Sequence, residues 1–301
     1  MPKINTKRIL TVITAMLCIV VFTVLMFIAR NPALLDRSGS HYTFDYDDDF
    51  IKFIDVGQGD SALIYSNGYS AIIDMGIAPS SDSIIDTLND CKINAVDMLI
   101  ISHYHTDHIG GFSDVANRFE IKNMLGPKVS DQNIEAAQNA KETVLSSGGR
   151  FYEAIYGLNF MLGEFKITVL GYCGFADENN RSVYVMAEID ERRFLFTGDG
   201  ELIAETELLK RTKDIDCDVL KVAHHGSKTS TNYEFLKAAT PEYAVISVGK
   251  DNSYNHPHSE SITALEKIDA EIYRTDYHGD IIFYIENGEI EIKTEKTGDY
   301  Y

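Results

Sequence analysis

The sequence predicts an α/β domain in which two β-sheets pack together with helices on their outer sides. Three observations favour this fold class. Hydrophobic residues make up 45% of the 301-residue chain, which is enough for a buried core. After residue 50, short β-rich segments separated by turn residues recur in both halves of the chain. Segments with a helical pattern lie between these strands, as they do in layered α/β folds.

An apolar stretch near the N-terminus predicts a membrane anchor. It runs over 21 residues, from Ile9 to Ala29, and follows Lys3, Lys7 and Arg8. A helix of this length rises about 31 Å, close to the thickness of the hydrocarbon core of a bilayer. Basic residues on the short N-terminal flank favour a cytoplasmic location for that flank. We therefore expect residues 1–30 to form a cytoplasmic tip and one transmembrane helix, in a single-pass protein of the cell membrane whose remaining chain is extracellular.

A cleaved signal peptide is the alternative for this segment. Its apolar region should be shorter and should end at an A-x-A-like site, and Phe27-Ile28-Ala29 is a poor match. Residues 31–49 follow as an acidic linker that includes the aspartates at 45 and 47–49. We interpret the linker as a solvated spacer. A calcium loop is the weaker alternative, because no Gly and Glu follow at the required offsets.

The formal net charge of −19 restricts the class of binding partner. A protein that binds nucleic acid mainly by neutralising phosphates should be basic. Binding at one site stays open, because bound metal ions would add positive charge there. The four cysteines, at positions 18, 91, 173 and 217, include no C-x-x-C pair. They indicate no disulfide framework.

The elements expected after residue 50 alternate between short strands and helices. In the first half, Asn67-Gly68 predicts a tight hairpin between two of the strands. The expected strands cover residues 50–56, 61–65, 70–73, 97–101, 158–162, 166–170, 182–190, 194–196, 218–222 and 243–248, with further strands near residues 271, 281 and 289. The expected helices cover residues 83–91, 131–146, 201–211, 233–239 and 259–268.

The segment after strand 97–101 carries a dense set of possible metal ligands. Residues 103–111 read HYHTDHIGG, so three imidazoles and one carboxylate fall within six positions. Imidazole and carboxylate are the usual ligands of zinc and related divalent ions. A solvated His-rich turn is the alternative, and this spacing favours a metal site. The Gly pair lets the chain turn tightly and begin a helix.

Two later strands also end in possible ligands. Asp199 follows strand 194–196, and His224 and His225 follow strand 218–222. Sites in α/β proteins usually lie at strand ends. Taken alone, Asp199 in a Gly-Asp-Gly sequence would be interpreted as a turn residue. The other ligand sets favour a metal ligand, and a carboxylate can bridge two ions through its two oxygens.

This combination resembles the metallo-β-lactamase superfamily, in which an H-x-H-x-D-H cluster, a later Asp and a later His bind two metal ions in an αββα sandwich. The resemblance covers roughly residues 50–285, within an expected hydrolase domain of residues 50–301. It implies that His103 and His105 bind one ion and that Asp107, His108 and a late His bind the other. Asp199 would bridge the two ions. The metal ligands implied are His103, His105, Asp107, His108, Asp199 and His225.

One departure from the superfamily pattern narrows this expectation. Most members have a further His between the cluster and the bridging Asp, and here no His occurs between His108 and His224. Residues 177–182 occupy the corresponding place. The first ion would then have a more open site or a weaker preference for zinc. The departure speaks against lactam hydrolases and against glyoxalases that cleave thioesters.

Further motifs are similar to the hydrolase domain of ComEC-type competence proteins. They are FIDVGQGDS at 53–61, ENN at 178–180, FTGD at 196–199, LKVAHHGS at 220–227, NHPH at 255–258 and YRTD at 273–276. In those proteins the domain accompanies a multispanning DNA-uptake channel and is thought to degrade the strand that is not imported. One helix cannot conduct DNA, so the chain resembles the detached catalytic part.

The resemblance also guides the choice between the two adjacent histidines. We favour His225 as the ligand, because similar phosphodiesterases with an HHG motif use the second His. His224 would then orient a ligand, contact substrate or simply be packed. Asp60 is expected to support the site through a turn. The expected substrate-binding residues are His224, His256, His258, Asn179 and Ser227.

Taken together, these patterns predict a membrane-anchored extracellular metal-dependent hydrolase. We expect a phosphodiesterase or nuclease that uses metal-bound hydroxide, with Asp107 and Asp199 as catalytic residues and two divalent ions, Zn or Mn, as cofactors. Its expected partners are the membrane, through one helix, and a phosphoester substrate, with DNA as one candidate. No obligate protein partner is predicted. The alternatives are a hydrolase of a small ester or lactone and a non-catalytic metal-binding domain.

Overall fold

The computed structural model of the chain describes residues 48–129, 134–174 and 177–296. The predicted membrane anchor, residues 1–30, and residues 31–47 of the predicted linker lie outside the described residues. Within the described ranges, no helix combines the length and the apolar character needed to cross a bilayer. The anchor therefore remains a prediction from the sequence.

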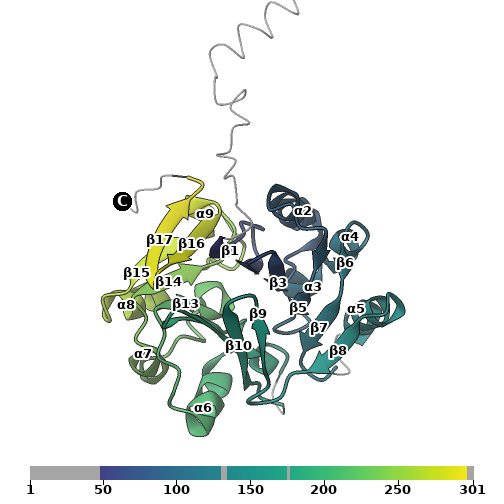
Figure 1. Ribbon diagram of the computed structural model, residues 1–301. Helices are drawn as coiled ribbons and strands as arrows, with labels where there is room; N and C mark the ends of the chain where they lie inside the picture. Colours follow the sequence, from purple (N-terminus) through teal and green to yellow (C-terminus); the bar gives the residue numbers. More distant parts are fainter. Residues whose placement is uncertain (1–47, 130–133, 175–176, 297–301) are drawn as a thin grey trace, which may run out of the picture. The chain divides into compact units, whose positions relative to one another are not determined.

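Two sheets form the centre of the described domain (Figure 1). The first has the strand order β17-β16-β1-β2-β3-β5-β7-β8, and the second has the order β15-β14-β13-β12-β11-β10-β9. The strands of the first sheet are β1 (Asp49–Phe53), β2 (Ala62–Ser66), β3 (Tyr69–Ile73), β5 (Met98–Ile100), β7 (Asn123–Gly126), β8 (Arg150–Glu153), β16 (Ile281–Glu286) and β17 (Glu289–Thr294). Those of the second are β9 (Asn159–Leu162), β10 (Phe165–Gly171), β11 (Tyr184–Ile189), β12 (Arg192–Phe196), β13 (Val219–Lys221), β14 (Tyr243–Ile246) and β15 (Glu271–Arg274). Strands β4 (Ala95–Val96) and β6 (Glu120–Ile121) form a separate small pair.

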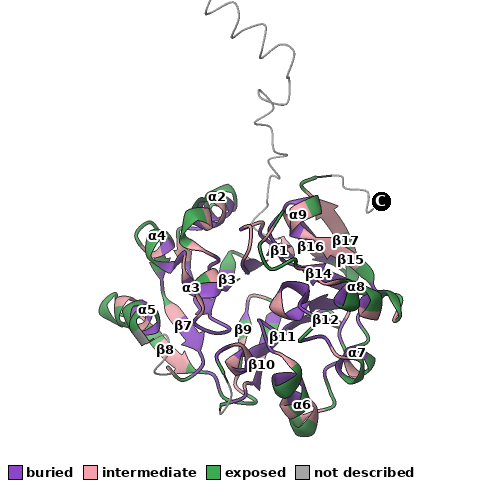
Figure 2. Ribbon diagram, turned by 180° about the vertical axis from the view of Figure 1, so that it is seen from behind, coloured by how far each residue is buried: buried purple, intermediate pink, exposed green. Residues whose placement is uncertain are grey.

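Helices cover the outer side of each sheet, as the sequence predicted. Helices α2, α4 and α5 lie beside the first sheet, and α6, α7 and α8 lie beside the second (Figure 1). Figure 2 shows that the central strands are mostly buried and that the outer sides of the helices are exposed, whereas the edge strands β8, β9 and β17 are only partly buried. The helices are α2 (Ser81–Asp90), α3 (Thr106–Ile109), α4 (Phe112–Ala116), α5 (Ile134–Ser146), α6 (Leu202–Arg211), α7 (Tyr233–Ala239), α8 (Ser259–Glu266) and α9 (Thr275–His278), with 3₁₀ turns at η2 (Ala78–Ser80), η3 (Asn179–Arg181) and η4 (Ala223–Gly226).

The alternation of side chains along the strands explains this layering. In β11, Val185 and Ala187 point into the core between the sheets, whereas Tyr184 and Met186 point toward the helices. Successive side chains of a strand point to opposite faces, so a strand buried on both sides is apolar throughout. The same rule places Lys221 on the same side of β13 as Val219, in the layer between the sheets.

The hairpin predicted at Asn67-Gly68 is confirmed. It joins the antiparallel strands β2 and β3, and its two residues have φ values of 50° and 78°. Two positive φ angles are the signature of the type I′ turn, whose twist matches that of the paired strands. The first sheet also takes strands from both ends of the domain, because β16 pairs with β1. The sequence predicted strands in each half of the chain but did not predict that β16 pairs with β1.

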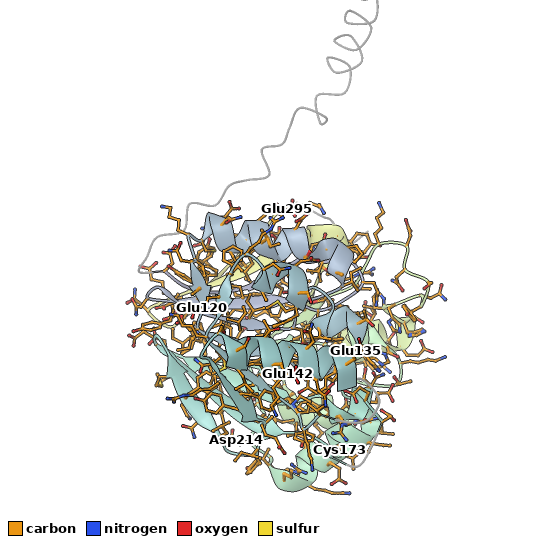
Figure 3. All side chains as sticks on the ribbon, turned by 90° about the vertical axis from the view of Figure 1, so that its right-hand side faces the viewer. Glu120, Glu135, Glu142, Cys173, Asp214 and Glu295 are labelled. Carbon is orange, nitrogen blue, oxygen red and sulfur yellow. The ribbon has the colours of Figure 1, made fainter. Side chains whose placement is uncertain are left out.

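Acidic side chains are exposed at several places on the outer surface of the domain. Figure 3 shows Glu120, Glu135 and Glu142 on the face that carries α5, and all three are exposed. Asp214 and Glu295 are exposed at other edges of the same view. Surface charges of one sign oppose the approach of a polyanion over a broad area. Recognition of a long polyanion by the whole surface is therefore disfavoured.

Candidate metal centre

The cluster predicted from the sequence lies at the end of β5 and continues into the short helix α3. The His103 Nε2 atom lies 3.0 Å from His105 Nδ1. Asp107 and His108 follow on α3, and His108 is fully buried. Gly59 lets another segment approach this turn, because a Cβ atom at Gly59 would lie 2.6 Å from the carbonyl oxygen of Asp107. The turn is therefore fixed by backbone packing as well as by β5.

Asp199 follows β12 and extends its carboxylate between the histidines of the other strand ends. Its Oδ1 atom lies 3.2 Å from His108 Nε2, and its Oδ2 atom lies 4.0 Å from His103 Nε2. The backbone N–H of Asp199 donates to Ser182 Oγ at 2.9 Å, which fixes the start of the turn. The Asp199 carboxylate therefore faces His108 with one oxygen and His103 with the other.

His225 reaches the same place from the end of β13 through an uncommon backbone conformation. His224 and His225 have φ/ψ values of 52°/44° and 53°/28°, in the left-handed region. Each such residue costs about 1–2 kcal/mol, so neighbouring contacts must stabilise the turn. His225 Nδ1 lies 2.9 Å from the carbonyl oxygen of Ser247, and its Nε2 lies 3.3 Å from Asp107 Oδ2.

These side chains fit a divalent ion. Ligand atoms of Asp107, His108, Asp199 and His225 all lie within 4.8 Å of one another. Among the described residues, His108 Nε2 and Asp199 Oδ1 are buried, face each other at 3.2 Å and have no other hydrogen-bond partner. Buried polar atoms are normally paired, and leaving them unpaired costs free energy. A metal ion would satisfy both atoms, and two imidazoles with two carboxylates match the ligand chemistry of zinc and manganese.

A second layer of buried polar groups holds two of these imidazoles. His108 Nδ1 lies 2.9 Å from Asp74 Oδ2, and Ser102 donates to the same carboxylate through its N–H and its hydroxyl. His225 Nδ1 lies 3.3 Å from Asp60 Oδ1. Lys221, which β13 directs between the sheets, lies 2.6 Å from the other oxygen of Asp60. Carboxylates behind a metal-binding imidazole orient the ring and raise its basicity.

The electrostatics of the two imidazoles follow from these carboxylates. Burial alone would lower the pKa of His108, but Asp199 and Asp74 raise it well above its ordinary value. Burial would likewise lower the pKa of His225, but Asp199 and Asp60 raise it to about 10. Burial and the neighbouring His108 lower the pKa of His103 well below its ordinary value. The carboxylate-rich side of the centre therefore attracts positive charge most strongly.

The domain has four layers, α/β/β/α, and its His and Asp ligands lie at the ends of strands. This arrangement points to one family. The family model for the metallo-β-lactamase superfamily matches residues 54–250. The chain belongs to the metallo-β-lactamase superfamily. The superfamily fold is thus confirmed, and it carries a candidate dimetal site of His and Asp residues.

Relatives and solved structures agree with this membership. The chain is 31% identical to ComE operon protein 3 of Bacillus subtilis over 261 residues, which are 79% of this chain and 33% of that protein. It is 28% identical to competence protein ComA of Neisseria gonorrhoeae, over 82% of this chain and 34% of that protein. Both are ComEC-type competence proteins, as the motifs predicted, and the chain spans about a third of their length. The metallo-β-lactamase fold protein YhfI from Bacillus subtilis has the same fold, with a TM-score of 0.54 and 16% identity over 79% of this chain and 100% of that chain.

The candidate metal centre opens into a cavity of about 540 Å³. Four of the six predicted metal ligands line it, namely His105, Asp107, Asp199 and His225, and His103 and His108 lie buried behind them. Of the predicted substrate-binding residues, Asn179, His224 and His256 line the cavity. Ser227 and His258 do not line it. Ser227 Oγ lies 2.9 Å from Thr229 Oγ1, and His258 Nδ1 accepts from the backbone N–H of Lys228.

His224 and Asn179 form a side-chain contact in the lining of the cavity. His224 Nδ1 lies 3.2 Å from Glu201 Oε1 and 3.3 Å from Thr229 Oγ1, so we assign the ring proton to this nitrogen. The remaining His224 Nε2 then accepts from Asn179 Nδ2 at 3.4 Å. With its amide N–H directed to His224, Asn179 leaves its Oδ1 atom buried and without a hydrogen-bond partner. The side chain therefore offers an oxygen to the site.

The sequence reasoning missed several contributors to the site. Lys221 stands in a strand that otherwise reads as apolar, and a lysine on the inward face of a buried strand was the available signal. Asp74 follows the predicted strand 70–73 and carries no ligand pattern of its own, yet its φ of 61° and its contact with His108 place it behind the centre. Tyr254 and Gln58 line the cavity from loops that carry no metal-ligand pattern. Asp60 supports the site as expected, through Lys221 and His225 more than through its turn.

Proposed function

We propose that this chain is a two-metal phosphodiesterase of the metallo-β-lactamase superfamily, with DNA among its substrates. The observation that carries the proposal is the cluster of ligand atoms of Asp107, His108, Asp199 and His225, all within 4.8 Å of one another, beside an open cavity. Paired divalent ions suit phosphoryl transfer because they neutralise the charge that develops on the phosphoryl oxygens. The likeness to competence proteins supports DNA as the first substrate to test.

The ligands divide between the two ions as the superfamily pattern implies. We assign His103 and His105 to the first ion, and Asp107, His108 and His225 to the second, with Asp199 shared. Manganese and zinc are both compatible with this mixture of imidazole and carboxylate. When bound, the ions would supply Lewis acidity and a water of lowered pKa as the nucleophile.

We assign Asn179 to the first ion and not to the phosphate. A phosphoryl oxygen accepts hydrogen bonds, so a contact with Asn179 would need its amide N–H, which is directed to His224. The buried Oδ1 atom can instead coordinate a cation. Asn179 would then replace the histidine that most superfamily members supply, with a harder ligand that suits manganese better than an imidazole does.

His256 is the best placed residue to contact the phosphoryl group directly. It lines the cavity, and burial together with the neighbouring His225 and His224 lowers the pKa of its imidazole to about 4. At neutral pH the ring is therefore neutral and donates one hydrogen bond without giving up a proton. We propose that His256 donates this hydrogen bond to the phosphoryl group and so orients the diester.

The location of the enzyme rests on the sequence alone. We propose that residues 1–30 anchor the chain in the cell membrane and that the hydrolase domain is extracellular, because the basic flank precedes the apolar stretch. Since the chain spans about a third of its competence relatives, the proposal is restricted to hydrolysis.

The test uses the 301-residue chain, purified in detergent and loaded with manganese or with zinc. Its substrates are single-stranded DNA and bis-p-nitrophenyl phosphate, and the control is Asp107→Ala/Asp199→Ala. We expect metal-dependent cleavage of both substrates and none by the double variant. Hydrolysis of the small ester alone would contradict the nuclease function and favour a hydrolase of small substrates. No hydrolysis by a fully loaded chain would favour a non-catalytic metal-binding domain.

A further inference from the structure

Tyr254 presents an aromatic ring to solvent at the edge of the cavity. It lies between β14 and α8, has 61% of its surface exposed and lines the cavity. Its ring lies over the imidazole of His256, with 5.7 Å between the centroids and 25° between the planes. One face of a stacked aromatic pair is thus available to a flat ligand.

The backbone that carries this pair is fixed by Asn252. Asn252 Oδ1 accepts from the backbone N–H groups of Tyr254 and His256, at 3.1 Å and 3.0 Å. Its Nδ2 donates to the carbonyl oxygens of Gly249 and His256, at 3.0 Å and 2.6 Å. A binding surface that is ordered before the ligand arrives loses less conformational entropy on binding. The hydrogen bonds of Asn252 fix the backbone of the loop, and the stacking contact with His256 orients the exposed ring.

The stacked pair is continuous with the candidate metal centre. The His256 ring lies 6.2 Å from the His225 ring, with 30° between the planes, and 5.4 Å from the His224 ring. The rings of His225, His256 and Tyr254 therefore form a row from a proposed metal ligand, His225, to the rim of the cavity. In a nucleotide, one sugar separates the phosphate from a flat aromatic base. A diester bound at the ions would bring a base of this kind to the rim.

Charge gives a reason for such a contact. The net charge is −19, and no Lys or Arg lines the described cavity. Binding that depends on the release of counterions from a nucleic-acid backbone needs basic side chains, which are missing from the cavity wall. Stacking of bases on aromatic rings does not need charge, and it tolerates any base because every base has a π-face.

We propose that Tyr254 and His256 form a stacking platform for a nucleobase, so that the preferred substrates of this site are nucleotide phosphodiesters with an unpaired base. The inference rests on the proposed phosphodiesterase function and specifies its substrate class. A base within a duplex is already stacked and paired, so single strands and strand ends fit the platform better than duplex DNA.

The test compares two oligomers with the same backbone. One is a short oligothymidylate, and the other is an abasic chain of equal length that carries the same phosphodiesters without bases. The variants are Tyr254→Leu, Tyr254→Phe and Tyr233→Leu, all in the 301-residue chain loaded with manganese. Tyr233 is the matched control, because it is 62% exposed and does not line the cavity.

We expect the Tyr254→Leu variant to lose on the order of tenfold in kcat/KM for the oligothymidylate, mainly through KM. Its activity on the abasic chain should stay within about twofold of the unmodified protein, because that chain has nothing to stack. Tyr254→Phe keeps the ring and should retain the preference for bases. Tyr233→Leu should change neither substrate. An equal loss on both oligomers, or no loss on either, would overturn the proposal.

A second readout does not depend on turnover. In EDTA-treated protein, saturation transfer by NMR should reach the thymine protons of the oligothymidylate, and Tyr254→Leu should abolish this transfer. If the loaded protein cleaves neither oligomer while the transfer is seen and is lost in the variant, the phosphodiesterase function fails and the platform stands. If both oligomers are cleaved equally and no transfer to thymine occurs, the platform fails and the phosphodiesterase function stands.

Discussion

The two halves of the candidate centre are supported by different kinds of group. His108 and His225, assigned to the second ion, are each held from behind by a buried carboxylate, at 2.9 Å from Asp74 and 3.3 Å from Asp60. His103, assigned to the first ion, has hydroxyl groups behind its Nδ1 atom, with Ser102 at 3.2 Å and Ser182 at 3.4 Å. A carboxylate behind an imidazole strengthens its attraction for a cation, and a neutral hydroxyl does so much less.

This difference predicts unequal affinities for the two ions. The second half has three protein ligands besides the shared Asp199. Buried carboxylates raise the pKa values of two of them, His108 and His225. The first half has His103, whose pKa is lowered, His105, which is partly exposed, and the neutral amide oxygen of Asn179. We therefore expect the ion of the second half to bind first and more tightly. Asp199 is shared by the two halves, so its loss should affect both ions, whereas other substitutions should affect one ion.

The largest effect is expected for Asp199→Ala, because this residue serves both halves. Loss of the shared carboxylate should lower kcat/KM for a phosphodiester by on the order of 10³-fold or more. Asp214→Ala is the control, since Asp214 is an exposed aspartate far along the chain from the cluster. Hydrolysis assays at saturating metal check the prediction. Activity within tenfold of the unmodified protein would contradict a shared role for Asp199.

The buried support of the second half should be costly to break. Lys221→Met removes the lysine cation 2.6 Å from the buried Asp60 and leaves only the His225 ring beside that carboxylate, which should lower the free energy of unfolding by about 3–5 kcal/mol. Lys122→Met is a matched control, because Lys122 lies 2.7 Å from Asp97 in an exposed ion pair and should cost less than about 1 kcal/mol. Urea unfolding of the metal-free chain measures both variants. Equal losses would mean that the buried pair does not support the centre.

The first half should respond to Asn179. Asn179→Ala should weaken the weaker metal-binding step by on the order of tenfold and leave the tighter step unchanged. Asn179→His restores an imidazole at the position and should shift the preference of that step from manganese toward zinc. Metal titrations followed by calorimetry check both variants. A change confined to the tighter step would place Asn179 with the wrong ion.

Metal binding should depend on pH in a direction that the imidazoles set. The pKa of His225 is raised to about 10 in the metal-free protein, and the pKa of His108 is also raised, so both rings hold a proton at neutral pH. A metal ion must displace these protons, so the tighter step should release protons and should strengthen as pH rises from about 6.5 toward 10. Calorimetry in buffers of different ionisation enthalpy counts the protons. Binding without proton release near pH 7 would contradict this description of the second half.

The sequence predicted the layered fold and most of the cluster because both depend on local patterns. Strand alternation, the Asn67-Gly68 turn and the spacing of residues 103–108 are readable within a few residues. The pairing of β16 with β1 was not readable, because strand partners distant in the chain leave no local signal. Lys221 shows the same limit at the site. Its partner Asp60 is far away in sequence, and only the folded sheets bring the two side chains together.

Ser227 and His258 have contacts in the structure that the motifs did not predict. Both stand in motifs shared with the competence proteins, and both were expected to contact substrate. In the structure Ser227 contacts Thr229, and His258 begins helix α8, so their side chains serve the loops that carry His225 and His256. A motif marks residues that are needed together, but it does not separate those that face the cavity from those that hold its walls. Tyr254 is the converse, because it faces the cavity without standing in a recognised motif.

Metal stoichiometry measured at increasing concentration tests the central claim most directly. Equilibrium dialysis of the 301-residue chain against manganese or zinc, followed by elemental analysis, should give two binding steps of one ion each. His225→Ala should remove the tighter step, His103→Ala should remove the weaker one, and Asp199→Ala should impair both. A single ion per chain, or two steps that persist in the Asp199→Ala variant, would contradict a dinuclear centre shared through Asp199.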